Sequence, residues 1–240
     1  MEAENRKRTA AIVLAAGNGK RMESNIKKQY MLIGDKPVIY YSLRAFQESF
    51  VDEIVLVVSP GDVSYCKKEI VEKYGFDKVS SIVEGGKERY HSVFQGLSSL
   101  TFCDYVFIHD GARPMLTVKI LERLYSCVLK YGACVAGMPV KDTIKIADKN
   151  HNIVSTPDRR LVFMVQTPQV FEYDLIKNAY DNLMENEQEF LENGIAITDD
   201  AMVVETFTGH RVKLLEGSYE NIKITTPEDI SIAEKFLGLS

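Results

Sequence analysis

Short apolar runs recur along the first 140 residues of the chain. They continue without polar interruption, which is typical of strands buried on both faces of a parallel sheet. Glycine or a polar residue follows most of them. The runs predict strands over residues 11–16, 54–58, 81–83, 105–109 and 133–136.

The stretches between these runs have apolar residues at helical spacing. They predict helices over residues 37–47, 62–74, 88–97 and 118–131. Because strands and helices alternate, we expect an α/β fold with a doubly wound, mostly parallel, Rossmann-like sheet. Ligands bind such sheets beyond the carboxyl ends of the strands. The candidate positions are therefore those that follow the runs, among them Gly17, Ser59, Gly85 and Asp110.

The pattern changes over residues 138–162. Residues 141–146 alternate polar and apolar, and a polar stretch then leads to Ile153 and Val154. This predicts an extended β-arm that protrudes from a single domain spanning residues 1–240. A lone two-stranded ribbon is only marginally stable in water, so we expect the arm to pack against a second subunit in a homodimer. A surface insertion without a partner is the alternative.

Near the end of the chain, consecutive residues have the pattern that begins a last helix. Thr226 is expected at the N-cap, Pro227 at the first helical position and Asp229 at the third. These residues cap a helix and carry no chemistry.

Composition limits the classes of partner. The net charge of −5 argues against nucleic acid as the main partner, because a phosphate backbone favours a broad excess of Lys and Arg. The four cysteines form no C-x-x-C pair and the four histidines show no metal-ligand spacing. The apolar run at residues 10–16 is too short for a signal core or a membrane span. We therefore expect a cytoplasmic protein that does not bind a membrane.

The loop after the first run is the first candidate site. Small residues at Ala15, Ala16, Gly17 and Gly19 let backbone N–H groups approach phosphate oxygens. The spacing fits neither a Walker loop nor the dinucleotide fingerprint, which would need glycine in place of Met22. Four cationic residues follow within a dozen positions: Lys20, Arg21, Lys27 and Lys28. Each alone fits a solvated loop, but together they suggest a binding site for a triphosphate.

Two later turns also follow predicted strands. Asp110 opens the sequence Asp-Gly-Ala-Arg-Pro, where a carboxylate can hold Mg²⁺ against nucleotide phosphates; a turn-forming Asp-Gly is the alternative. Gly85 and Gly86 precede Arg89 and Ser92, so backbone and hydroxyl groups there could contact the edge of a base. A plain strand-to-helix turn explains this segment equally well.

Taken in order, these motifs resemble those of the 2-C-methyl-D-erythritol 4-phosphate cytidylyltransferase family of the non-mevalonate isoprenoid pathway. The likeness runs from about residue 10 to about residue 235, and no single motif carries it. It comprises Ala15-Ala16-Gly17-x-Gly19-x-Arg21-Met22, Lys28-Gln29-Tyr30, Gly85-Gly86-x-x-Arg89-x-x-Ser92-Val93, His109-Asp110-x-Ala112-Arg113-Pro114, Asp142-Thr143, Asp158-Arg159, Gln166-Thr167-Pro168-Gln169, Thr198-Asp199 and Asn221-Ile222-Lys223-Ile224-Thr225.

The resemblance implies a nucleotidyltransferase that joins CTP to a sugar phosphate and releases pyrophosphate. It implies that Arg21 and Lys28 stabilise the transition state and that Asp110 meets Mg²⁺ and the triphosphate. It also implies a homodimer in which the arm borders the partner's site. By the same resemblance, the first loop binds the phosphates through Ala15, Ala16, Gly17 and Gly19. Gly86 and Ser92 border the cytosine. The sugar phosphate is positioned by Arg159, Lys223 and Thr143.

The chain departs from the family pattern at a few positions. Lys87 stands where an aspartate is usual beside the base, and a lysine cannot accept a hydrogen bond from the cytosine amino group. Selection of the base would then rest on backbone carbonyls. Gly111 replaces a more usual alanine, and Lys141 replaces a more usual arginine, which weakens any bidentate contact there.

Three other functions are compatible with parts of the pattern. A D-ribitol-5-phosphate cytidylyltransferase shares the fold, but its family typically has Ala-Gly-Gly at the first turn, where this chain has Ala15-Ala16-Gly17. Met22 and the absence of an acid at Ser59 count against an NAD-dependent dehydrogenase. A sugar-phosphate binding module would not explain two separate sets of cations.

Overall fold

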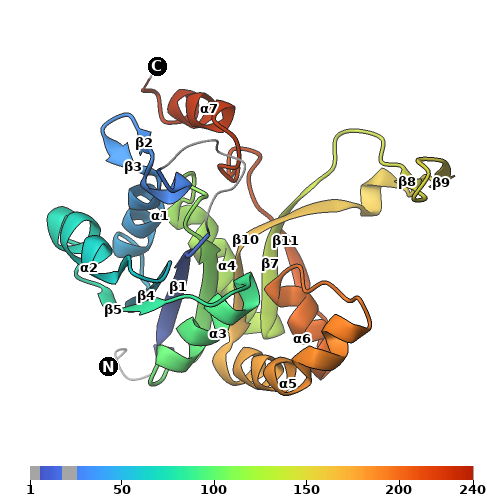
Figure 1. Ribbon diagram of the computed structural model, residues 1–240, viewed down its shortest axis with the longest axis horizontal. Helices are drawn as coiled ribbons and strands as arrows, with labels where there is room; N and C mark the ends of the chain where they lie inside the picture. The colour runs from blue at the N-terminus through green and yellow to red at the C-terminus, as the bar shows by residue number, and fades with distance from the viewer. Residues whose placement is uncertain (1–5, 18–25, 240) are drawn as a thin grey trace.

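The computed structural model describes residues 6–17 and 26–239. Their centre is a seven-stranded sheet with the strand order β11-β7-β10-β6-β1-β4-β5 (Figure 1). Neighbouring strands pair in parallel except for β10, which is antiparallel to both β6 and β7. The strands are β1 (Thr9–Ala15), β4 (Glu53–Val58), β5 (Val79–Glu84), β6 (Tyr105–Asp110), β7 (Ala133–Pro139), β10 (Phe163–Glu172) and β11 (Lys213–Glu216).

Burial on both faces of the sheet explains why the sequence of β1 is apolar without interruption. Alternate side chains point to opposite faces of a strand. Ala11 and Val13 belong to the hydrophobic cluster on one face, and Ala10 and Ile12 belong to the cluster on the other. Both faces are therefore covered, as the doubly wound fold requires.

Helices form a layer on each face of the sheet. The first cluster contains residues of α1 (Val38–Gln47), of α4 (Val118–Tyr131) and of the irregular helix formed by α2 (Val63–Tyr65) and η2 (Cys66–Glu72). The second cluster contains residues of α3 (Arg89–Ser99), α5 (Tyr173–Glu192) and α6 (Asp200–Thr208). The predicted α/β fold with a mostly parallel sheet is confirmed. The expected helix over residues 62–74 is only partly regular, since η2 is a π-helix.

A small third cluster lies beside the sheet. The C-terminal helix α7 (Glu228–Phe236) contacts β2 (Leu32–Ile33), which pairs with β3 (Lys36–Pro37). Ile33, Val38, Ile224 and Ala233 are fully buried there. Residues near 28 and near 223, which are distant in the sequence, are thereby joined by one apolar cluster.

The arm extends away from the body, beyond the ends of β7 and β10 (Figure 1). Its paired part is shorter than the alternating sequence predicts, because only β8 (Ile146–Ala147) and β9 (Ile153–Ser155) pair. A short 3₁₀ turn, η3 (Arg159–Leu161), leads back into β10. Apolar side chains on the arm are exposed, with Val154 at 66% and Leu161 at 81% of full accessibility. Without a core to cover one face, little holds the alternating residues in a longer ladder.

Parallel register aligns the carboxyl ends of four strands. Leu14 of β1 lies opposite Asp110 of β6, and Ala15 lies opposite Val58 of β4, which in turn lies opposite Glu84 of β5. The loops that follow these strands therefore meet at one edge of the sheet.

Candidate active site

A cavity of ≈ 580 Å³ opens at this edge of the sheet. It is of the size that small-molecule sites have in proteins. Eight residues to which the family resemblance gives a role line it, and so does Gly85: Ala15, Ala16, Gly17, Lys28, Gly86, Ser92, Asp110 and Lys223.

Buried hydrogen bonds fix the end of β1 at the cavity. The Gln29 side chain is 2% exposed, and its amide nitrogen donates to the Ala15 carbonyl at 2.6 Å. The Ser59 hydroxyl donates to the Ala16 carbonyl at 3.2 Å. A Cβ added to Gly17 would meet nothing within 4 Å, so the space in front of this backbone is open to a ligand.

The turn after β5 packs closely against the first loop. A Cβ on Gly85 would lie 2.5 Å from the Ala16 Cβ and 2.6 Å from the Ser92 hydroxyl, so only glycine fits. The Ser92 hydroxyl accepts from the Gly86 N–H at 3.2 Å and donates to the Glu88 carbonyl at 3.3 Å. It holds the turn that forms this wall of the cavity.

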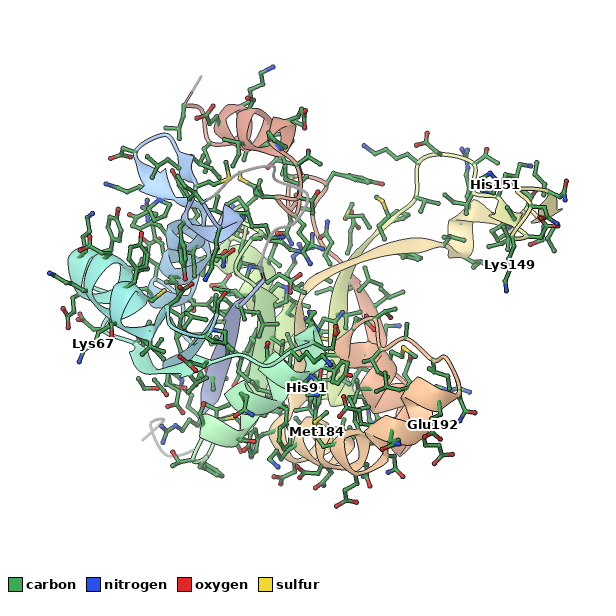
Figure 2. All side chains as sticks on the ribbon, in the orientation of Figure 1. Lys67, His91, Lys149, His151, Met184 and Glu192 are labelled. Carbon is green, nitrogen blue, oxygen red and sulfur yellow. The ribbon has the colours of Figure 1, made fainter. Side chains whose placement is uncertain are left out.

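Helix α3 begins directly after this turn. Glu88 and His91 form a reciprocal capping box at its start. His91 lies on α3 beside α5, and its Nε2 is 2.9 Å from the Glu187 carboxylate (Figure 2). These contacts anchor the turn to the helix layer behind it.

Asp110 is the central charged group of the cavity. Its two oxygens face different cations: Oδ2 is 2.6 Å from the Lys223 Nζ, and Oδ1 is 3.3 Å from the Arg89 Nε. Burial raises the pKa of Asp110, but Arg89 and Lys223 outweigh burial and hold this pKa well below its usual range. The carboxylate is therefore charged at every physiological pH.

A second carboxylate holds Arg89 from behind. Asp200, at the start of α6, is fully buried and accepts hydrogen bonds of 2.8 Å from both Nη1 and Nη2 of Arg89. The Tyr180 hydroxyl donates to the same carboxylate at 2.6 Å. Although burial alone lowers the pKa of Arg89, Asp200 and Asp110 outweigh it and raise this pKa well above its usual value.

A neutral histidine supports the backbone of Asp110. Burial lowers the pKa of His109 to about 3. Its Nε2 donates to the Arg113 carbonyl at 3.3 Å, which leaves Nδ1 to accept from the Thr167 hydroxyl at 3.1 Å. Thr167 Oγ1 in turn accepts from the Asp110 N–H at 3.0 Å. This chain of bonds sets the position of the strand end.

The segment around Lys223 is held against the loop that follows β6. The Ile224 N–H donates to the Ala112 carbonyl at 2.8 Å, and Arg113 Nη1 donates to the Asn221 carbonyl at 2.8 Å. Lys28 joins the same segment, since its Nζ donates to the Ile224 carbonyl at 3.1 Å. Lys28 and Lys223 are thus brought together although 195 positions separate them.

The other expected residues are not part of this cavity. Thr143 and Arg159 are exposed on the arm, where Arg159 Nη1 donates to the Lys141 carbonyl at 3.1 Å. Lys141 places its Nζ 3.7 Å from the centre of the Tyr219 ring. Gly19 and Arg21 lie outside the described residues.

The cavity offers few side-chain ligands to a metal ion. Within residues 6–17 and 26–239, no group of three or more His, Cys, Asp or Glu side chains could hold a metal by itself. Mg²⁺ commonly uses one or two carboxylates together with substrate phosphates. Two carboxylates line the cavity: Asp110 could supply such a ligand, whereas Glu88 caps the start of α3.

The sequence predicted no role for three residues of the site. Gln29 and Arg89 stood in recognised motifs without a function, and Asp200 was not singled out. A cation that follows a predicted strand at the ligand-binding edge of the sheet is the available signal for Arg89. Its partner, 111 positions later, left no such signal.

Comparisons with known proteins all indicate the same family. The model of the 2-C-methyl-D-erythritol 4-phosphate cytidylyltransferase family matches residues 9–238. The enzyme of that name from Lachnoclostridium phytofermentans is 50% identical over 230 residues, which cover 96% of each chain. The one from Lachnospira eligens is 51% identical over 228 residues, or 95% of this chain and 98% of that one.

Solved structures agree. The 4-diphosphocytidyl-2C-methyl-D-erythritol synthase of Anaerococcus prevotii superposes with a TM-score of 0.81 at 33% identity and covers 97% of this chain and 96% of its own. The 2-C-methyl-D-erythritol 4-phosphate cytidylyltransferase of Thermus thermophilus gives 0.74 at 26% identity, with 95% and 98% covered. With this fold and cavity, the chain belongs to the 2-C-methyl-D-erythritol 4-phosphate cytidylyltransferase family.

Proposed function

We propose that the protein transfers CMP from CTP to 2-C-methyl-D-erythritol 4-phosphate, giving 4-diphosphocytidyl-2-C-methyl-D-erythritol and pyrophosphate in isoprenoid precursor synthesis. The observation that carries this proposal is the convergence of Lys28, Lys223 and Asp110 at a cavity walled by two glycine-containing loops. Such a cavity offers cations and backbone groups to a polyphosphate. Family membership names the second substrate.

The reaction needs no general base from the protein. A phosphate oxygen of the sugar phosphate is already an anion near neutral pH, and it attacks the α-phosphorus of CTP while pyrophosphate leaves. The residues must therefore hold two anions together and offset the charge that builds at phosphorus. Lys28, and Arg21 from the family pattern, would take the second role; Lys223 would position the attacking phosphate.

The base and the metal would contact different residues of the cavity. Gly86 and Ser92 would border the cytosine, and the backbone of Ala15, Ala16 and Gly17 would face the phosphates. Asp110 would hold Mg²⁺, which when bound offsets charge on the triphosphate. Because Asp110 already contacts Lys223, this carboxylate would link the nucleotide to the group that positions the second substrate.

We also propose a cytoplasmic homodimer. Among the described residues, no helix combines the length and the apolar character that crossing a bilayer requires. The exposed apolar residues of the arm, including Ile153 and Leu161, favour burial against a second copy. Thr143 and Arg159 would then reach the sugar phosphate in the partner's cavity.

The direct test is pyrophosphate release from CTP and Mg²⁺ with each acceptor offered separately. Release with 2-C-methyl-D-erythritol 4-phosphate and not with D-ribitol 5-phosphate is the expected result. Release only with ribitol phosphate would keep the mechanism and overturn the substrate. Release with UTP at a comparable rate would show that Lys87 has relaxed the choice of base.

A further inference from the structure

Arg89 is shared unequally between two carboxylates. Its terminal nitrogens make two hydrogen bonds of 2.8 Å to Asp200, whereas its Nε is 3.3 Å from Asp110. A bidentate pair fixes the plane of a guanidinium group. Asp200 therefore determines where the Nε–H of Arg89 points.

The two carboxylates have different surroundings. The Asp110 side chain is 11% exposed and lines the cavity, whereas the Asp200 side chain is fully buried and does not line it. Asp200 is also held by Tyr180, which α5 supplies from the helix layer. Its direct link to the cavity is Arg89, which lines it.

We propose that Asp200 is a positioning residue for the nucleotide site: by engaging both terminal nitrogens of Arg89, it prevents Arg89 from pairing fully with Asp110. Asp110 then keeps its oxygens for Lys223 and for the cation that accompanies the nucleotide. This inference rests on the proposed function.

Neutralising Asp200 has a definite consequence. The Arg89 side chain is only 28% exposed, so losing its partner is costly, and Asp110 is the other carboxylate that it contacts. Arg89 turns onto Asp110 and competes there with Lys223. The cavity becomes more positive, which favours a metal-free polyphosphate, while the carboxylate that would receive the cation is occupied.

The matched variants are Asp200→Asn and Asp199→Asn. Each removes one negative charge at the start of α6, but Asp199 caps the helix and accepts from Gln169 instead of contacting Arg89. Asparagine is also a good N-cap, so this control keeps the helix start. Titration calorimetry with CTP in EDTA is compared with pyrophosphate release from CTP in a Mg²⁺ series.

Asp200→Asn is expected to bind metal-free CTP about tenfold more tightly than wild type and to need about tenfold more Mg²⁺ for half-maximal turnover. Asp199→Asn is expected to stay within about twofold of wild type in both measurements. If Asp200→Asn binds metal-free CTP no more tightly than wild type, Asp200 is merely structural and the proposal is wrong.

A milder variant covers the case in which Asp200→Asn does not fold. Tyr180→Phe keeps the volume and the carboxylate but removes one hydrogen bond to Asp200, and it is expected to shift both measurements in the same directions by about twofold. A shift in the opposite direction overturns the proposal. If wild type releases no pyrophosphate with either acceptor, the proposed function fails, while the comparison of metal-free CTP binding still tests whether Asp200 restrains Arg89.

Discussion

At the scale of single residues, the site is organised by charges that are paired before any ligand arrives. Asp110 lies between Arg89 and Lys223, and Arg89 is held by Asp200. Pre-paired groups need little reorganisation during a reaction, which is where electrostatic catalysis gains its advantage. Lys28 is placed beside this network by the Ile224 carbonyl.

The variant Lys28→Ala is expected to lower kcat by an amount equivalent to about 2–4 kcal/mol, by analogy with the loss of an oxyanion donor. KM for CTP should change much less, because Lys28 is proposed to act on charge that builds in the transition state. Steady-state kinetics measure both. Lys67→Ala, on the outer surface of η2, is the control lysine (Figure 2). An unchanged kcat in Lys28→Ala would remove Lys28 from the mechanism.

His109 makes stability depend on pH. Its pKa is lowered to about 3 in the folded protein, mainly by burial, whereas an unfolded histidine titrates near about 6.5. Below that value the unfolded chain binds a proton that the folded chain refuses. The free energy of unfolding should therefore fall as pH decreases from about 6.5, by about 2 kcal/mol at pH near 5.

Denaturant unfolding of His109→Gln between pH 8 and pH 5 tests this origin. The variant will be less stable than wild type at pH 8, but its slope with pH should be shallower. His151→Asn is the control, since His151 is an exposed residue of the arm with a φ of 65° that asparagine tolerates (Figure 2). Equal slopes in His109→Gln and wild type would contradict the assignment.

Much of the site was predictable because its residues follow apolar runs. Gly17, Gly86 and Asp110 all come after such runs, and parallel register brings strand ends together. Asp200 could not be found in this way, because it opens a helix and meets the cavity only through a long-range pair. The role of Arg159 stays a prediction, since it depends on a second chain.

At the scale of elements, the predicted start of the last helix was wrong in its capping residue. The N-cap is Pro227, and the Thr226 hydroxyl does not cap the helix. The Asp229 carboxylate accepts instead from the N–H groups of Thr225 and Thr226, at 2.7 and 2.9 Å. Burial raises the pKa of Asp229, but these bonds outweigh it and lower the pKa.

Asp229→Ala is therefore expected to destabilise the protein by about 1–2 kcal/mol in denaturant unfolding. Glu228→Ala removes the same charge from an exposed neighbour and should cost less than about 0.5 kcal/mol. Although α7 contacts β2 near Lys28, neither residue lines the cavity, so kcat at 25 °C should remain close to that of wild type in both variants. Equal losses of stability would show that charge, rather than the hydrogen bonds, matters at this position.

Other elements show where pattern ends and tertiary structure begins. The central strands were predicted because their burial is recorded in uninterrupted apolar runs. The reversed direction of β10 was not, since direction depends on how the chain returns from the arm. The π-helical turn of η2 has the same apolar spacing as an ordinary helix, and the sequence does not distinguish the two.

At the scale of the whole molecule, the question is which chain supplies Arg159 to a given cavity. Within one chain Arg159 lies on the arm and does not line the cavity. Arg159→Ala should raise KM for the sugar phosphate with little change for CTP. Sedimentation at several concentrations should show a dimer, and a monomer throughout would overturn the proposed role of the arm.

A mixing experiment separates the two possible origins of Arg159. In a mixed dimer of Lys28→Ala and Arg159→Ala, an arm that serves the partner creates one cavity with both defects and one cavity with neither. With the sugar phosphate kept well below the raised KM of Arg159→Ala, both parent proteins turn over slowly, and random exchange should then restore about a quarter of wild-type turnover. An arm that serves its own chain leaves one defect in every cavity, so no recovery follows. Recovery would therefore mean that this enzyme's site is completed only by assembly, whereas its absence, with exchange verified, would assign Arg159 to its own chain.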